Sequence, residues 1–287
     1  MLSCVAVTAA RAAAGETAFP QDFSELISQA QRATNAALED GVKLIEVEFP
    51  SAGLAAVPGD AEGANEMSYS MDFLRSYVSI FNRDAETTRI YFPDKSELKL
   101  ATKGDAGKDV EPRFGDVKFQ LDYLQNPTGL LDIGLDVRKV DVSKRVRDAD
   151  RVFVIGYPHF QVQEMLAVWD LYKAAAQDSG RPIIVFNGEL DRIRQPWYYP
   201  PIFYPKVAKM GKEFIPGFEQ VYYLKNFKGS APGCLFRCYP GPWQVMVRVS
   251  PDPSDCKTVW TGDEMPTLKE VQMSILPKAT GRGPMTL

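Results

Sequence analysis

Apolar residues recur at helical spacing near the start of the chain and then give way to a continuous apolar run. The recurring positions are Phe23, Leu26, Ile27, Ala30, Ala33 and Ala37. This spacing predicts a helix with one buried face. Asp22 followed by Glu25 is typical of a helix start, and Gly41 is typical of a helix end. The run 42–49, stopped by Pro50, predicts a strand directly after the helix.

The clearest pattern lies between residues 151 and 186. Two short apolar runs, 151–156 and 182–186, flank a segment of helical periodicity at 160–178. This order predicts a βαβ unit, and the lack of alternation within each run favours strands that are buried on both faces of a parallel sheet. A right-handed crossover would bring residues 156–160 and 187–191 together at the carboxyl ends of the two strands.

Weaker signals divide the segment before this unit. Glycine and proline predict a loop at 51–65, and three glycines predict another at 103–115. Between these loops we expect a helix over 66–81 and a short strand over 89–92.

Three short strands are predicted after the βαβ unit, at 219–224, 233–239 and 243–249. The last two are separated only by Pro240-Gly241-Pro242 and should form a hairpin. Alternation puts Trp243 and its i+2 neighbours on one face of the final strand, which we expect to be the buried face. The predicted fold class is therefore α/β, a mixed sheet with a central parallel βαβ unit, flanking helices and a C-terminal antiparallel hairpin.

The chain shows no internal repeat and no long linker, so we expect one α/β domain over 19–260. Residues 1–18 have Arg11 but only one acidic residue, Glu16. This segment is interpreted as the remnant of an organelle-targeting peptide or as a disordered N-terminus. Residues 261–287 are interpreted as a C-terminal extension that ends in a loose, glycine-containing tail.

Composition narrows the classes of partner. The 287 residues include 33 Lys+Arg and 37 Asp+Glu, a net charge of −4, which argues against nucleic acid. No apolar stretch approaches the ~20 residues that a membrane span needs, so any membrane contact is expected to be peripheral. Four cysteines and one histidine do not form a zinc-ligand set or a disulfide framework. The sequence predicts no metal and no cofactor.

The only histidine, His159, lies between the first strand and the helix of the predicted βαβ unit. A neutral ring there could relay a proton. The same edge of the sheet should hold the other members of a candidate ligand crevice, which are Tyr157, Asn187, Glu189 and Asp191. The alternative is that His159 only caps the helix. No nucleophile elbow, phosphate-binding loop or dinucleotide fingerprint is present, so the sequence favours a non-enzymatic protein.

A second candidate site follows the βαβ unit. Residues 196–205 contain five aromatic residues and four prolines and cannot form a helix or a central strand. Three lysines follow at helical spacing. The candidate partner-binding residues are Trp197, Tyr198, Tyr199, Phe203, Tyr204, Lys206, Lys209 and Lys212. Aromatic rings beside lysines suit a protein partner or an anionic membrane surface; the alternative is a segment folded over the protein's own core. A further basic cluster between Arg138 and Arg147 is interpreted as a solvated helix face.

Several segments resemble a family of plant, algal and cyanobacterial proteins that share a domain of unknown function. The resemblance is carried by QAQRA at 29–33, AALEDG at 36–41 and KLIEVEFP at 43–50, continuing with RIYFPD at 89–94, GRPIIVFN at 180–187 and RCYPGPW at 237–243. The family includes proteins of the LOW PSII ACCUMULATION type, and the same domain occurs fused to chloroplast adenylate kinases. The aromatic segment lies outside these motifs.

The resemblance implies a chloroplast protein of the stroma or the stromal face of the thylakoid. It implies an auxiliary factor in photosystem assembly, most directly photosystem II, that binds a photosystem subunit or assembly intermediate and makes peripheral contact with the thylakoid membrane. The alternative is a small-molecule or nucleotide-binding domain, or an enzyme, that uses the crevice around His159. An RNA-binding plastid factor is disfavoured by the net negative charge.

Overall fold

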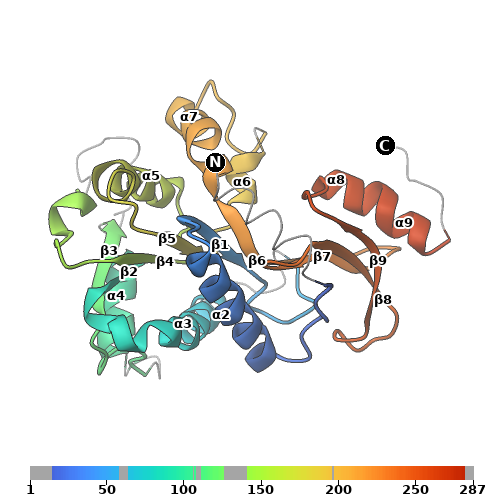
Figure 1. Ribbon diagram of the computed structural model, residues 1–287, viewed down its shortest axis with the longest axis horizontal. Coiled ribbons are helices and arrows are strands. Elements are labelled where there is room, and N and C mark those ends of the chain that lie inside the picture. Colours follow the sequence, from blue (N-terminus) through green and yellow to red (C-terminus); the bar gives the residue numbers. More distant parts are fainter. Residues whose placement is uncertain are drawn as a thin grey trace. The chain divides into compact units, whose positions relative to one another are not determined.

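A computed structural model describes residues 15–57, 64–105, 107, 111–125, 141–195 and 197–281 (Figure 1). Most of the predicted targeting remnant and the end of the predicted tail lie outside these residues. The chain divides into two compact units. Unit 1 comprises residues 1–42, 47–69 and 220–287, and unit 2 comprises residues 43–46 and 70–219. Each unit combines separated stretches of sequence, and the single domain expected over 19–260 stays a prediction.

Unit 2 contains a parallel sheet. Its strands are β2 (Thr88–Asp94), β3 (Gln120–Gln125), β4 (Val152–Gly156) and β5 (Ile183–Phe186), in the order β3-β2-β4-β5. The start of β1 (Leu44–Glu48) belongs to the same unit, where the backbone N–H of Ile183 donates to the carbonyl of Lys43 at 2.8 Å. The predicted βαβ unit is confirmed, because β4 and β5 pair in parallel around an intervening helix.

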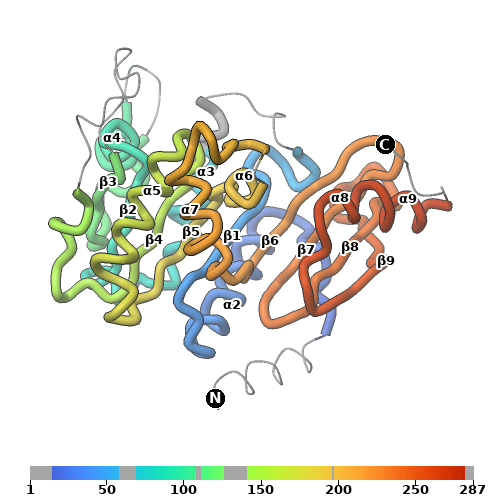
Figure 2. The backbone as a smooth tube through the Cα atoms, turned by 90° about the horizontal axis from the view of Figure 1, so that it is seen from above, coloured from blue at the N-terminus to red at the C-terminus, as the bar shows by residue number. Residues whose placement is uncertain are grey.

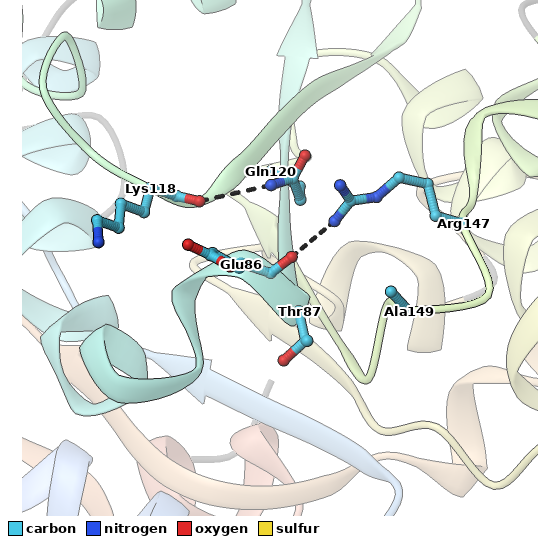
Figure 3. A pocket seen from close by; sticks show the side chains of 6 residues that line it. All are labelled: Glu86, Thr87, Lys118, Gln120, Arg147 and Ala149. Carbon is cyan, nitrogen blue, oxygen red and sulfur yellow. Dashed lines mark hydrogen bonds between the residues drawn. The ribbon is translucent and has the colours of Figure 1, made fainter.

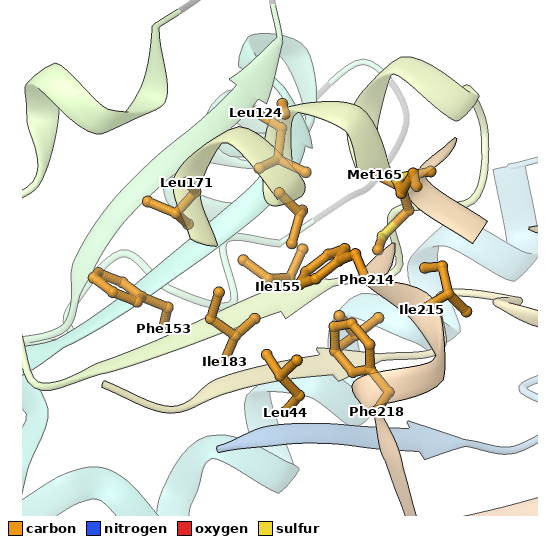
Figure 4. Close-up of a cluster of buried hydrophobic side chains, with 14 of the residues drawn as sticks. Leu44, Leu124, Phe153, Ile155, Met165, Leu171, Ile183, Phe214, Ile215 and Phe218 are labelled. Carbon is orange, nitrogen blue, oxygen red and sulfur yellow. The ribbon is translucent and has the colours of Figure 1, made fainter. Parts of the chain in front are cut away.

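Helices precede and follow these strands. They are α3 (Ala64–Tyr77) with a 3₁₀ extension (Val78–Thr87), α4 (Lys95–Lys103), α5 (Val162–Leu171) with a π-helical turn (Tyr172–Ala176), α6 (Asp191–Arg194) and α7 (Pro205–Glu213), with short 3₁₀ turns at Val142–Arg145 and Ile215–Gly217. Aromatic and branched side chains from the strands, α5 and the segment after α7 form the core of unit 2, with Phe153, Ile155 and Phe214 among them (Figure 4).

Unit 1 is built around four antiparallel strands. They are β6 (Glu219–Phe227), β7 (Gly233–Cys238), β8 (Trp243–Arg248) and β9 (Cys256–Gly262), each paired with the next (Figure 2). Helix α2 (Phe23–Glu39) also belongs to this unit, together with α8 (Leu268–Glu270), a π-helical turn (Val271–Ile275) and α9 (Leu276–Ala279). The predicted helix start is confirmed, because the Asp22 carboxylate accepts from the backbone N–H of Glu25 at 2.8 Å. Gly41 ends the helix at a φ of 82°.

The predicted fold class is confirmed: the protein is mixed α/β, with parallel strands in unit 2, flanking helices and the antiparallel β7–β8 hairpin near its C-terminus. The prediction that β8 buries only one face is wrong. Trp243 and Val245 pack in one cluster with Val271, while Gln244 on the other face is buried and bonds to the backbone of Thr17. Elements distant in sequence therefore cover both faces.

The prediction of a solvated basic helix before residue 147 is also wrong for the part that the structure describes. Residues 142–145 form only one 3₁₀ turn. Arg145 pairs with Asp122, and Arg147 pairs with the fully buried Asp150. Arg138 lies outside the described residues.

Candidate functional site

The candidate ligand crevice lies where the parallel strands of unit 2 end. Tyr157 follows β4 directly, and its backbone N–H donates to the carbonyl of Phe186 at the end of β5, at 2.7 Å. The Nδ1 atom of His159 lies 3.0 Å from the carbonyl oxygen of Asn187. The structure therefore brings His159 and Asn187 together as the crossover geometry predicts.

Backbone strain is concentrated at this edge. Tyr157, Asn187 and Glu189 have φ values of 37°, 50° and 47°, and among the described residues they are the only ones other than glycine with positive φ. Each residue held in this region costs on the order of 1–3 kcal/mol, and such conformations cluster at binding and catalytic sites. The strain therefore supports a functional role for this edge.

The phenol of Tyr157 makes a hydrogen bond that the sequence analysis did not predict. Its hydroxyl donates to the Glu97 carboxylate at 3.2 Å, and both side chains are buried. Glu97 stands in the first turn of α4, which the Asp94 side chain caps at the end of β2. Burial raises the pKa of Glu97 to about 7, against the opposing effect of the hydrogen bond from Tyr157. A carboxyl group with this pKa exchanges its proton near neutral pH.

A second buried carboxyl group lies close to the first. Glu164 in α5 is 4% exposed, and its Oε2 atom has no hydrogen-bond partner among the described residues. Burial raises the pKa of Glu164 to about 8, and the negative charges of Asp94 and Glu97 raise it further. Two acids with near-neutral pKa values beside strained backbone are the pattern expected of a functional site.

The other acidic residues of the predicted crevice are held in ion pairs. Glu189 pairs with Arg192, and Asp191 lies 3.1 Å from the guanidinium of Arg194, which also bonds to Glu46. Arg192 donates to the carbonyl of His159 at 3.4 Å. These pairs tie Glu189 and Asp191 to the arginines of α6. No group of three or more His, Cys, Asp or Glu side chains in the described part of the chain could hold a metal ion.

The second candidate site is the surface formed by residues 197–212, here called the aromatic–lysine surface. Trp197, Ile202 and Phe203 are 69%, 88% and 76% exposed. Tyr198 and Tyr204 are also exposed, whereas Tyr199 is partly buried and packs on the core of unit 2. The structure thus displays most of these rings to solvent and folds one of them inward.

Helix α7 presents its lysines on the outside of this surface. Val207 and Met210 pack into the core of unit 2, which turns Lys206, Lys209 and Lys212 to solvent. Lys209 lies 3.8 Å from the Glu213 carboxylate, an exposed pair of small energetic value. Apolar rings and a row of positive charges therefore stand on one continuous segment.

Comparison with protein families decides the lineage. Residues 20–273 match the family model described as Domain of unknown function (DUF1995). The chain belongs to the DUF1995 family. No curated protein and no solved structure matches this DUF1995 chain. Within the described residues, no helix has both the length and the apolar character to cross a membrane.

Sequence reasoning missed Glu97 and Glu164 for different reasons. Asp94 followed by Glu97 is a helix-start signal of the same type as Asp22 followed by Glu25, so α4 could have been found. The position of Glu97 beside Tyr157, 60 residues later in the chain, carries no local signal. Glu164 stands in the first turn of α5, where a glutamate ordinarily faces solvent.

Proposed function

We propose that this DUF1995 protein is a chloroplast auxiliary factor in photosystem assembly, most directly photosystem II. It docks on a photosystem subunit or assembly intermediate at the stromal surface of the thylakoid through the aromatic–lysine surface. One observation carries the docking role: Trp197, Ile202 and Phe203, three large apolar side chains within seven residues, stand more than two-thirds exposed. The photosystem context comes from the resemblance to proteins of the LOW PSII ACCUMULATION type.

The energetics favour a covered surface. Burying a large apolar side chain contributes about 1.5–3 kcal/mol, so three of them supply most of what a specific contact needs. Trp and Tyr are enriched at the energetic centres of interfaces. On the surface of a protein, several large exposed apolar side chains close together mark an interaction site.

The lysines specify the partner's charge. Lys206, Lys209 and Lys212 share one exposed face of α7. Positive charges beside a docking patch speed association with an acidic surface, and salt weakens this effect. The proposed partner surface therefore carries acidic side chains around an apolar centre.

A matched set of variants tests the proposal. The tagged chain carrying Trp197→Ser, Ile202→Ser and Phe203→Ser should no longer purify with the assembly intermediate, while its circular dichroism spectrum and melting temperature stay near those of the parent. Val249→Ser, in unit 1, is the control, because Val249 is also an exposed apolar side chain. Co-purification of the triple variant at the parent level would contradict the proposal.

A second candidate function rests on the strained edge of unit 2. Positive φ at Tyr157, Asn187 and Glu189, beside the buried Glu97, favours a small-molecule or nucleotide-binding domain that uses the crevice around His159. A thermal-shift panel of nucleotides and metabolites tests it, because a ligand of the native state raises the melting temperature. His159→Ala should remove the rise. A parent protein that no compound stabilises would contradict this candidate.

A further inference from the structure

A pocket of about 460 Å³ opens at the amino-terminal ends of β2, β3 and β4 in unit 2 (Figure 3). Its lining residues are Glu86, Thr87, Lys118, Gln120, Arg147 and Ala149. A volume of roughly 300–1,000 Å³ is typical of small-molecule sites. The pocket lies at the opposite end of the strands from the crevice, about 20 Å away for a strand the length of β2.

A buried ion network lies behind this pocket. Arg89 on β2 donates to Asp150 at 2.7 Å and to Asp122 on β3 at 3.2 Å. Arg145 pairs with Asp122, and Arg147 pairs with Asp150 at 3.0 Å. Three guanidinium groups face two carboxylates, so the network carries one surplus positive charge. The Arg147 side chain is 43% exposed, so this surplus charge reaches solvent at Arg147, where it attracts an anion with a strength that salt reduces.

Arg147 connects the network to the pocket. Its Nε and Nη2 atoms donate to Asp150, and Nη2 also donates to the carbonyl of Glu86 at 2.6 Å. These bonds hold the guanidinium group at the pocket, and Figure 3 shows the bond to the Glu86 carbonyl. Its Nη1 atom has no acceptor among the described residues and remains available as a charged donor.

The other lining residues supply one further cation and several neutral or acidic hydrogen-bonding groups. The ammonium of Lys118 makes no ion pair within the described part of the chain. In Figure 3 its side chain extends away from Arg147, so the flexible side chain would rotate toward the pocket to bind an anion there. Gln120 keeps its side chain near the pocket by donating to the carbonyl of Lys118 at 3.5 Å. The Glu86 carboxylate repels a bare anion but accepts hydrogen bonds from hydroxyl groups. The lining therefore suits a ligand with an anionic end and a hydroxylated end.

We propose that this pocket binds a small hydroxylated organic anion. Its phosphate or carboxylate group binds Arg147 and Lys118, and its hydroxyl groups bind Glu86, Gln120 and Thr87. Arg binds such oxyanions through several donors in one plane, and a nearby Lys adds charge without demanding geometry. The proposal is independent of the docking role, because none of its residues belongs to the aromatic–lysine surface.

Isothermal titration calorimetry with three probes separates the two ends of the ligand. Glycerol 3-phosphate and glycerate carry an anionic group with hydroxyls, and glycerol carries the hydroxyls alone. We expect one or both anions to bind the parent protein, with affinity falling as salt rises, and glycerol not to bind. A parent protein that binds neither anion overturns the proposal.

Variants locate the binding. Lys118→Gln should raise the Kd of the better anion about tenfold. Lys144→Gln should leave it unchanged, because Lys144 is an exposed lysine of the same unit outside the lining. Arg147 is left intact, because it also satisfies the buried Asp150. Equal binding by the parent and Lys118→Gln would overturn the proposal, as would loss of binding in His159→Ala alone, which would place the ligand in the crevice.

Glu86→Gln tests the hydroxylated end. The variant should bind inorganic phosphate more tightly than the parent, because a repelling charge is gone. It should also lose part of the parent's preference for glycerol 3-phosphate over inorganic phosphate. An unchanged preference would overturn the assignment of the hydroxyl groups to this side of the pocket.

Discussion

The aromatic–lysine surface and the crevice both depart from the usual placement of side chains, in which apolar groups are buried and acidic groups are exposed. At the surface, apolar Ile202 and Phe203 stand in water. At the crevice, Glu97 and Glu164 are buried. The two departures are relieved by different means. A buried acid becomes tolerable by keeping its proton, whereas an exposed apolar ring is relieved only when another surface covers it. The comparison therefore supports the proposal that the surface binds a partner, and it predicts pH-dependent stability from the buried acids at the crevice.

The largest effect is expected from substitutions in the aromatic–lysine surface. The triple variant Trp197→Ser, Ile202→Ser and Phe203→Ser should weaken binding to the partner about 100-fold or more, because it removes the central apolar contacts. Its free energy of unfolding should change by less than about 0.5 kcal/mol, as expected for exposed positions. Binding assays and urea denaturation measure the two quantities. Unfolding of the variant would show that these rings stabilise the fold and would contradict a docking surface.

The next effect tests the crevice through pH. The pKa of Glu164 is raised to about 8 in the folded protein. The folded state therefore keeps a proton that the unfolded state releases above its ordinary pKa near 4.5, so the free energy of unfolding falls as pH rises between these values. Glu164→Gln should remove this contribution. Urea denaturation at about pH 5 and pH 8 should show a fall that is roughly 3 kcal/mol smaller than in the parent.

The matched control for this variant is Glu213→Gln. Glu213 is an exposed glutamate of the same unit whose nearest cation is Lys209, at 3.8 Å. Glu213→Gln should leave the pH dependence of the free energy of unfolding as it is in the parent. Parallel pH curves for the parent and Glu164→Gln would show that Glu164 is ionised in the folded protein at neutral pH.

A smaller effect is expected at the bond between the crevice and α4. Tyr157→Phe removes the hydroxyl that donates to Glu97 and should destabilise the protein by about 1 kcal/mol. Because that bond favours the carboxylate, its loss should raise the pKa of Glu97 above about 7. NMR titration of the Glu97 side chain measures the pKa. A lower pKa in the variant would mean that Glu97, and not Tyr157, is the donor.

The smallest expected effect isolates backbone strain. Glu189→Gly and Glu189→Ala both remove the ion pair to Arg192, but only glycine adopts a φ of 47° without cost. Glu189→Gly should be more stable than Glu189→Ala by about 0.5–1 kcal/mol, as measured by thermal unfolding. If the alanine variant is the more stable of the two, the strain at this edge is negligible.

Local sequence signals predicted the parts of the fold that are locally determined. The Asp22 cap, the helical face after it and the two apolar runs around α5 each depend on neighbouring residues, and each is confirmed. Strand β3 was missed, because its alternation QLDYLQ looks polar while Asp122 is buried against arginines. Strand β9 was missed because its lysine and threonines resemble a loop. Strand β3 depends on pairing with β2, which lies in a separate part of the sequence, whereas β9 pairs with β8, the strand directly before it.

The candidate site follows the same division. His159 and Asn187 were predicted to meet, because the crossover of a βαβ unit fixes which loops share an edge. Tyr157 was placed at the right edge, but the direction of its phenol depends on α4, which the sequence analysis had not predicted. The pocket at the amino-terminal ends of β2, β3 and β4 was not predicted. The sequence analysis interpreted the basic cluster that includes Arg147 as solvated, whereas Arg145 and Arg147 pair with the buried Asp122 and Asp150.

One measurement tests the docking account most directly. Thylakoids from cells that express the tagged parent or the tagged triple serine variant are gently solubilised and separated on a native gel, and the tagged band is identified by mass spectrometry. The account predicts that the parent migrates with a photosystem assembly intermediate and that the variant, equally abundant and folded, migrates alone. A parent protein that migrates as a free stromal monomer, or a variant that still migrates with the intermediate, would contradict the account.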